Sequence, residues 1–115
     1  MRKLLTVGLF IALCLPASAS TFWHGNVVGV KKWDELQVRK WPSAKSQIID
    51  SYENGDDVSL TGRCKNIVTN VSFRIDGGRP SAWKHNRMSK PNVWCQVSSP
   101  HGKIGWVRGR FVWPD

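Results

Sequence analysis

The chain has 115 residues, which is room for one domain, and we expect no attached catalytic domain. Its 17 Lys and Arg residues outnumber 8 Asp and Glu residues, so the net charge is +9 and the composition favours anionic partners. The 7 tryptophans are more than a core of this size is expected to absorb, which indicates exposed aromatic side chains.

The first nineteen residues are typical of a signal peptide for export. Two basic residues at 2–3 precede an apolar segment at 4–15, and residues 17–19 fit the small-x-small cleavage pattern. We therefore expect cleavage after Ala19 and a periplasmic or secreted protein with a net charge of 15 − 8 = +7. The apolar segment is short for a membrane span, and we expect no transmembrane segment after cleavage.

The cysteines agree with export. An alternative to cleavage after residue 19 is a lipoprotein processed at Cys14, but the preceding Leu13 is bulky where that signal normally has a small residue. Without the leader two cysteines remain, Cys64 and Cys95, and an even count in a small exported chain favours a disulfide over a metal site or a free thiol. Closing this loop of roughly thirty residues adds on the order of 3 kcal/mol of stability.

After residue 20 the chain consists of short apolar runs separated by turn residues, which predicts an all-β fold. The turn at 53–56 contains Asn-Gly, which supplies the positive φ angles of a tight turn. Residues 20–26 are interpreted as an N-terminal extension and residues 27–115 as the domain. The predicted strands lie at 27–30, 36–39, 46–52, 57–64, 93–97, 104–107 and 111–113.

Alternation within two of these strands supports the disulfide. In residues 57–64 the apolar side chains and Cys64 share one face, and Arg63 lies on the other. In residues 93–97 Cys95 shares a face with two valines, and Trp94 lies opposite. Both cysteines are in phase with the apolar face, so we predict a bond between Cys64 and Cys95.

Residues 65–93 form a long excursion between the cysteines. Its first part is rich in β-formers and predicts an extended strand or a hairpin that turns at 76–78. Its second part, 79–90, is basic and predicts a mobile loop that presents Trp83. Loops of this length in compact domains are usually functional or disordered.

The order of motifs resembles the bacterial SH3-like domain, often called SH3b. The resemblance rests on LQVRKWPSAKSQIIDSYENGDDVSLTG at 36–62, WCQV at 94–97 and GKIGWVRGRFV at 102–112. The chain departs from the family pattern at Trp41, where glycine is common, and in the length of the excursion. The resemblance implies a small, partly open barrel of five to seven short strands that binds cell-wall peptide, peptidoglycan or an envelope protein and has no catalytic activity.

Groups for catalysis are scarce in this sequence. A Cys-His peptidase needs a free thiolate, and both remaining cysteines are expected in the disulfide. Asp56 and Asp57 are adjacent in sequence and point to opposite sides, so they cannot flank a substrate as acid and base. Asp50 and Glu53 are interpreted as solvated surface charges. Zinc would need two ligands beyond the cysteines, and the histidines lack ligand spacing, so we expect no catalytic residue, metal or cofactor.

Aromatic and basic residues are the candidate binding groups, while Trp106, within the strand that closes the barrel, is expected to be mostly buried. For Trp41 and Trp113 the alternative is that they cap the open ends of the barrel. The residues expected to line a groove are Trp41, Tyr52, Trp83, Trp94 and Trp113. The residues expected to meet an anion are Arg79, Lys84, Arg87 and Lys90.

Three functional hypotheses follow. The first is a monomeric exported module that recognises cell-wall peptide, peptidoglycan or an envelope protein. The second is a secreted effector that binds lipopolysaccharide, glycosaminoglycan or extracellular DNA by charge; export makes nucleic acid the least available of the anionic partners. The third is an exported hydrolase that uses Cys64 or Cys95 as a free thiol.

Overall fold

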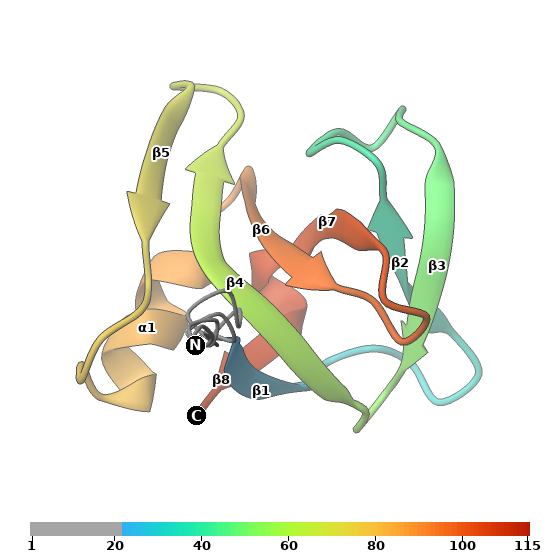
Figure 1. Ribbon diagram of the computed structural model, residues 1–115, viewed down its shortest axis with the longest axis horizontal. Helices are drawn as coiled ribbons and strands as arrows, with labels where there is room; N and C mark the ends of the chain where they lie inside the picture. Colours follow the sequence, from blue (N-terminus) through green and yellow to red (C-terminus); the bar gives the residue numbers. More distant parts are fainter. Residues whose placement is uncertain (1–21) are drawn as a thin grey trace, which may run out of the picture.

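The computed structural model describes residues 22–115 (Figure 1). The predicted signal peptide and its alternative at Cys14 lie outside the described residues. The described chain forms eight strands, one helix and a 3₁₀ turn at Gly109–Phe111. The elements are β1 Trp23–Val27, β2 Glu35–Arg39, β3 Ile48–Glu53, β4 Asp57–Asn66, β5 Val71–Arg74, α1 Ser81–Met88, β6 Val93–Ser98, β7 Ile104–Arg108 and β8 Val112–Pro114.

The strands form one antiparallel sheet that is open at its ends. Its order is β3-β2-β7-β6-β4-β1-β8, and β5 pairs with β4 outside this order. In the middle of the sheet β6 and β7 pair in continuous register, with Gln96 opposite Trp106, whereas the register between β4 and β6 shifts once. The predicted small, barrel-like all-β fold is confirmed, with one strand more than expected because the excursion adds β5.

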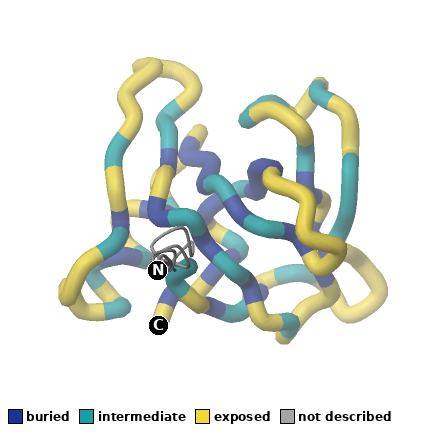
Figure 2. The backbone as a smooth tube through the Cα atoms, in the orientation of Figure 1, coloured by how far each residue is buried: buried dark blue, intermediate teal, exposed yellow. Residues whose placement is uncertain are grey.

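The buried residues that form the core gather in the middle of the fold (Figure 2). The alternation predicted for residues 57–64 is confirmed, because every second residue from Val58 to Cys64 is buried. The predicted disulfide is also confirmed: Cys64 and Cys95 occupy paired positions on β4 and β6, and both are 0% exposed. Other members of the core are Val27, Leu36, Val38, Leu60, Val97, Val107 and Val112.

The first strand begins earlier than predicted. Residues 23–27, and not 27–30, pair with β4 and β8, so most of the predicted N-terminal extension belongs to the sheet. The buried position in the middle of this strand is Gly25, where an added Cβ would lie 2.7 Å from the carbonyl oxygen of Trp113. Because β8 approaches so closely, the strand has no apolar side chain there, and its sequence carries no alternating signal.

The hairpin in the excursion turns at 67–70 and not at 76–78. The Asn66 side chain accepts hydrogen bonds from the backbone N–H groups of Val68 and Thr69, at 3.0 and 3.1 Å. Asn70 adopts a left-handed φ of 64° and donates its N–H to the carbonyl of Asn66. An asparagine that caps its own turn in this way replaces the Gly-Gly turn that the sequence suggested.

The predicted loop over 79–90 is wrong, because residues 81–88 form helix α1. The helix packs against β8 and against the 3₁₀ turn. Its buried side chains are Lys84 and Met88, one turn apart. Gly109 permits this packing, since a Cβ there would collide with the carbonyl oxygen of Met88. A helix with a single apolar residue on its buried face has no clear amphipathic pattern, which explains the error.

Candidate functional site

A cleft of about 300 Å³ opens between the β4–β5 hairpin and the loop that joins β2 to β3. In Figure 1 these two segments rise on either side of β6 and β7. Trp41 and Pro42 form one wall, and Trp106 and Gln96 contribute from β7 and β6 between the walls. The opposite wall consists of Arg63 and Lys65 from β4 and Ser72 from β5.

The wall that carries Trp41 is a short loop held by hydrogen bonds. The Ser46 hydroxyl accepts the N–H of Trp41 at 3.1 Å and donates to the carbonyl of Trp41 at 2.9 Å. Arg39 reaches back from the end of β2 and donates to the carbonyl of Ser46 at 2.7 Å. The backbone of Trp41 is therefore fixed on both sides while its side chain stays 62% exposed. An exposed indole on a fixed backbone provides a surface for stacking at a small entropic cost.

The opposite wall stands where it does because β4 bends. Its register with β6 shifts between Leu60 and Cys64, and Gly62 in this interval has a φ of 95°. A bulge of this kind bends and twists a strand. The φ of Gly62 lies in the left-handed region that favours glycine, so the bend depends on this residue. Arg63 follows directly and is exposed.

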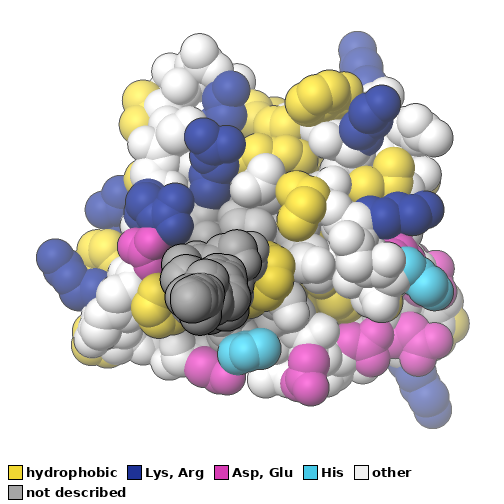
Figure 3. Space-filling view, viewed as in Figure 1, with side chains coloured by type: hydrophobic (Ala, Val, Ile, Leu, Met, Phe, Trp, Pro, Cys, Tyr) yellow, Lys and Arg dark blue, Asp and Glu magenta, His cyan; other side chains and the backbone are white. Residues whose placement is uncertain are grey.

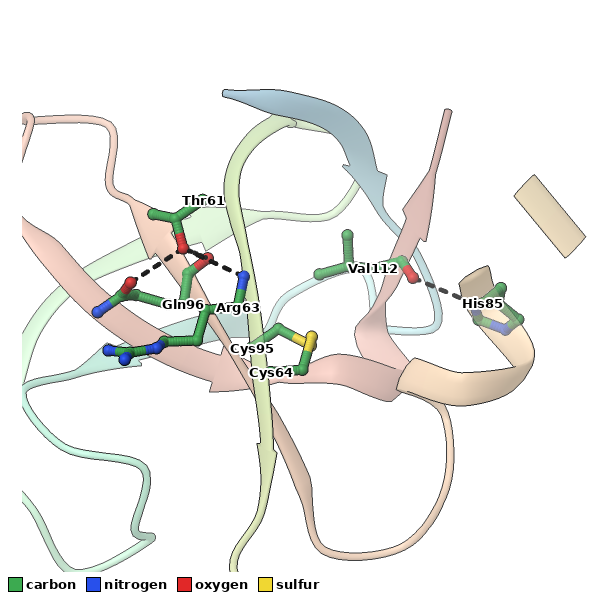
Figure 4. The surroundings of a disulfide bond; sticks show 7 residues. All are labelled: Thr61, Arg63, Cys64, His85, Cys95, Gln96 and Val112. Atoms are coloured by element: carbon green, nitrogen blue, oxygen red, sulfur yellow. Dashed lines mark hydrogen bonds between the residues drawn. A yellow bond between two sulfur atoms is a disulfide. The ribbon is translucent and has the colours of Figure 1, made fainter. Parts of the chain in front are cut away.

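The floor of the cleft consists of Trp106, which is buried, and Gln96, whose side chain is held by a hydrogen bond. Trp106 is 8% exposed, as predicted, and it lies between Arg39 of β2 and Gln96 of β6 in the sheet register. The Thr61 hydroxyl donates to the Gln96 side-chain oxygen at 2.9 Å, which orients the amide. Figure 4 shows Arg63 and Gln96 on one side of the sheet and the disulfide on the other. The disulfide thus joins β4, which carries one wall, to β6, which carries part of the floor, on the side away from the cleft.

The cleft is electropositive. Its lining includes Arg63 and Lys65 and no carboxylate. Among residues 22–115 the one lysine or arginine within ion-pair distance of an Asp or Glu side chain is Arg74, which binds Asp76. Figure 3 shows basic side chains beside hydrophobic ones in the upper part of this face and acidic ones along its lower edge. Unpaired cations in a concave surface attract anionic groups.

The structure does not bring the predicted groove residues together. Trp41 lies in the cleft, but Tyr52 is 2% exposed in the core, where its hydroxyl donates to the carbonyl of Ser98 at 2.7 Å. Burial raises the pKa of Tyr52 to about 12. Trp94 is also 2% exposed, although it points away from the disulfide face, and the guanidinium of Arg108 lies 4.9 Å from its ring centroid. Tyr52 and Trp94 therefore offer no surface to a ligand in the cleft.

Trp83 and Trp113 lie at helix α1, and no residue of this helix lines the cleft. The guanidinium carbons of Arg79 and Arg87 lie 4.5 and 5.3 Å from the ring centroid of Trp83. Trp113 packs on His85, with ring centroids 4.2 Å apart. The two tryptophans thus belong to a helical surface separate from the cleft.

The four cations predicted to meet an anion divide into two kinds. Arg79, Arg87 and Lys90 are exposed, whereas Lys84 is 4% exposed. The Lys84 ammonium donates to the backbone oxygen of Asp115 at 3.3 Å and lies 5.2 Å from the ring centroid of Trp23. Lys84 therefore holds the helix against the two ends of the described chain, and the other three cations remain at the surface.

Six residues of the cleft were not among the predicted site residues: Pro42, Arg63, Lys65, Ser72, Gln96 and Trp106. The alternation of strand residues contained part of the signal, because it placed Arg63 on the face opposite the core. The missing information was the bend of β4, which turns that face toward Trp41. This bend depends on a register shift that local sequence patterns do not reveal.

Asp50 differs from its interpretation as a solvated charge. Its side chain is 9% exposed, and His101, whose side chain is 77% exposed, places Nδ1 3.0 Å from the carboxylate. The Ser99 hydroxyl contributes most to lowering the pKa of Asp50, with further hydrogen bonds from Ser51 and His101, so that it lies well below the usual range. The Ser99 hydroxyl also accepts the N–H of Lys103 and is buried, so it links the 99–103 turn to Asp50 of β3.

Comparisons of this chain with protein-family models, with curated proteins and with solved structures find no match. Within residues 22–115 no helix is both long and apolar enough to cross a membrane. The same range contains no group of three or more His, Cys, Asp or Glu side chains placed to hold a metal ion.

Proposed function

We propose that this protein is an exported, non-catalytic SH3-like module that binds cell-wall peptide or peptidoglycan in the cleft between Trp41 and Arg63. The observation that carries the proposal is the combination of an exposed indole, a tryptophan floor and two unpaired cations in one concave site. The sequence resemblance to SH3b domains, the disulfide and the predicted signal peptide agree with a role in the cell envelope.

The lining of the cleft supports binding over reaction. It contains neither a carboxylate nor a histidine, so it offers no side chain with a pKa suited to general acid–base catalysis near neutral pH. The thiols of Cys64 and Cys95 are joined and buried, which argues against the hypothesis of a thiol hydrolase. What the cleft offers is stacking, hydrogen bonding and positive charge.

These three features match a short peptide with a free carboxylate. The Trp41 ring can cover an apolar or sugar group, because aromatic faces pack on both. Arg63 can form two parallel hydrogen bonds to a carboxylate, and Gln96 can bond to a peptide amide. The volume of about 300 Å³ is at the lower end for small-ligand pockets and suits one or two residues of a stem peptide.

The test is retention of the purified protein by cell-wall sacculi, followed by the affinity for soluble wall fragments. Trp41→Ala and Arg63→Gln should each weaken binding about tenfold, which corresponds to about 1.4 kcal/mol. Trp33→Ala is the matched control, because Trp33 is 83% exposed and lies beside Glu53 and Asn54, outside the cleft. Equal binding of the Trp41 and Trp33 variants, or no retention of the native protein, would refute the proposal.

Charge alone is the second candidate function. It is favoured by the many lysines and arginines that have no carboxylate partner in residues 22–115. Binding to lipopolysaccharide or glycosaminoglycan by this route should weaken steeply between low and physiological salt, because bound counterions are released. Strong salt dependence together with no effect of Trp41→Ala would favour this function over the first.

A further inference from the structure

The tip of the β4–β5 hairpin exposes apolar side chains beside a group of cations. Ile67, Val68 and Val71 are 38%, 71% and 57% exposed. In Figure 2 the hairpin projects from one corner of the fold and is exposed over its end. Val68 lies in the turn and Val71 at the start of β5, and neither belongs to the core, so the hairpin tip presents apolar surface to the solvent.

A hollow of about 310 Å³ lies between this hairpin and the end of helix α1. Val71, Phe73 and Val93 give it an apolar lining, and Arg87 and Lys90 stand at its side. No carboxylate lines it. The nearest acidic residue along the chain, Asp76, is already bound to Arg74. The hollow therefore combines apolar surface with unopposed positive charge.

Arg87 beside the hollow, and Arg79 over the neighbouring Trp83, both lie against aromatic rings. The guanidinium carbon of Arg87 lies 4.9 Å from the centroid of Phe73 and 5.3 Å from that of Trp83. Arg79 covers Trp83 at 4.5 Å. Neither arginine forms a side-chain hydrogen bond with residues 22–115, so their N–H groups are free to bind phosphate oxygens.

We propose that the hairpin tip and the cations of α1 dock the protein on an anionic phospholipid bilayer. Val68 and Val71 enter the boundary between headgroups and acyl chains, while Arg79, Arg87 and Lys90 contact lipid phosphates. Charge complementarity selects this occupant, because an apolar tip with cations and no carboxylate beside it suits a surface that is apolar below and negative above. The docking surface is separate from the cleft, so it does not rest on the function proposed for the cleft.

The experiment is co-sedimentation of the full chain with vesicles of phosphatidylcholine alone and of phosphatidylcholine mixed with phosphatidylglycerol. We expect binding to the mixed vesicles only. The double variant Val68→Ser/Val71→Ser should bind about tenfold more weakly, and Lys90→Gln about fivefold more weakly. The matched controls are Ile104→Ser, which removes apolar area from a side chain that is 52% exposed on β7, and Lys32→Gln in the exposed 31–34 segment.

Two results would overturn the proposal. If the double valine variant binds as well as Ile104→Ser, another segment or charge alone drives the association. If the native protein does not bind mixed vesicles but forms a dimer that the double valine variant abolishes, the tip contacts a second copy of the chain. Trp41→Ala should leave vesicle binding unchanged, so failure of the cleft proposal and failure of this one are distinguishable.

Discussion

Removing the disulfide is the perturbation with the largest expected effect on this fold. The bond between Cys64 and Cys95 joins β4 to β6 just after the shift in their register. It closes a loop with a sequence separation of 31, which contains β5 and α1. Reduction of the native chain breaks this constraint and leaves every side chain in place, so it is a cleaner change than substitution of two buried residues.

The size of the effect follows from the entropy of the unfolded chain. A loop of this length, when it is closed in the unfolded state, is expected to stabilise the folded state by about 3.7 kcal/mol near room temperature. A domain of this size has a total free energy of unfolding of roughly 5–15 kcal/mol. Reduction should therefore lower the unfolding temperature by about 15 to 30 °C.

Urea unfolding followed by tryptophan fluorescence measures the difference between the oxidised and reduced proteins. The oxidised form should have the higher midpoint and a smaller dependence of free energy on urea, because its unfolded chain exposes less surface. Reduction should also weaken binding in the cleft, since Arg63 and Lys65 flank Cys64 on one wall. Midpoints that correspond to a difference below about 1 kcal/mol would refute the reasoning from loop entropy.

Three further predictions concern single groups. The pKa of Asp50 is lowered on folding, so its contribution to stability is present above the unfolded pKa of about 4 and is lost as pH falls through the folded pKa. The free energy of unfolding, measured as a function of pH, should therefore fall less steeply in acid for Asp50→Asn than for the native protein. Tyr52 is the chain's single tyrosine, so an ultraviolet titration should show one phenolate with a pKa of about 12, and stability should fall as pH rises from about 10 toward this value; a titration near 10 would contradict burial of the hydroxyl. Gly105→Ala should cost about 1–3 kcal/mol in urea unfolding, because the added Cβ would lie 2.5 Å from Val38, whereas Gly78→Ala, with open space around it, should cost less than about 0.5 kcal/mol.

Alternation along the strands was sufficient to predict much of the fold. Cys64 and Cys95 were placed on the core face because each is in phase with neighbouring apolar residues, and both are buried and bonded. The closing strand was predicted within one residue of its bounds, and Trp106 was expected to be buried there. These features can be predicted from residues close in sequence, because successive side chains of a strand point to opposite faces of the sheet.

Features that depend on distant segments were missed. Trp94 lies on the outer face of β6, yet it is buried, with the Arg108 guanidinium over its ring from the neighbouring strand. Lys84 is buried because Trp23 and Asp115, far apart in sequence, meet at helix α1. In both cases a long cationic side chain lies against an aromatic ring, and such a contact follows from the path of the chain and not from local polarity.

The sheet order predicts that a ligand bound in the cleft would stabilise the fold. Trp41 belongs to the half formed by β2 and β3, whereas Arg63 belongs to the half formed by β4, β1 and β8, and β6 and β7 lie between the two halves. A ligand that contacts both walls bridges these halves across the opening of the curved sheet. Its binding free energy therefore adds to the free energy of unfolding, as for any ligand that binds only the folded state. The excursion contributes to this effect because β5 extends the wall on the far side from Trp41.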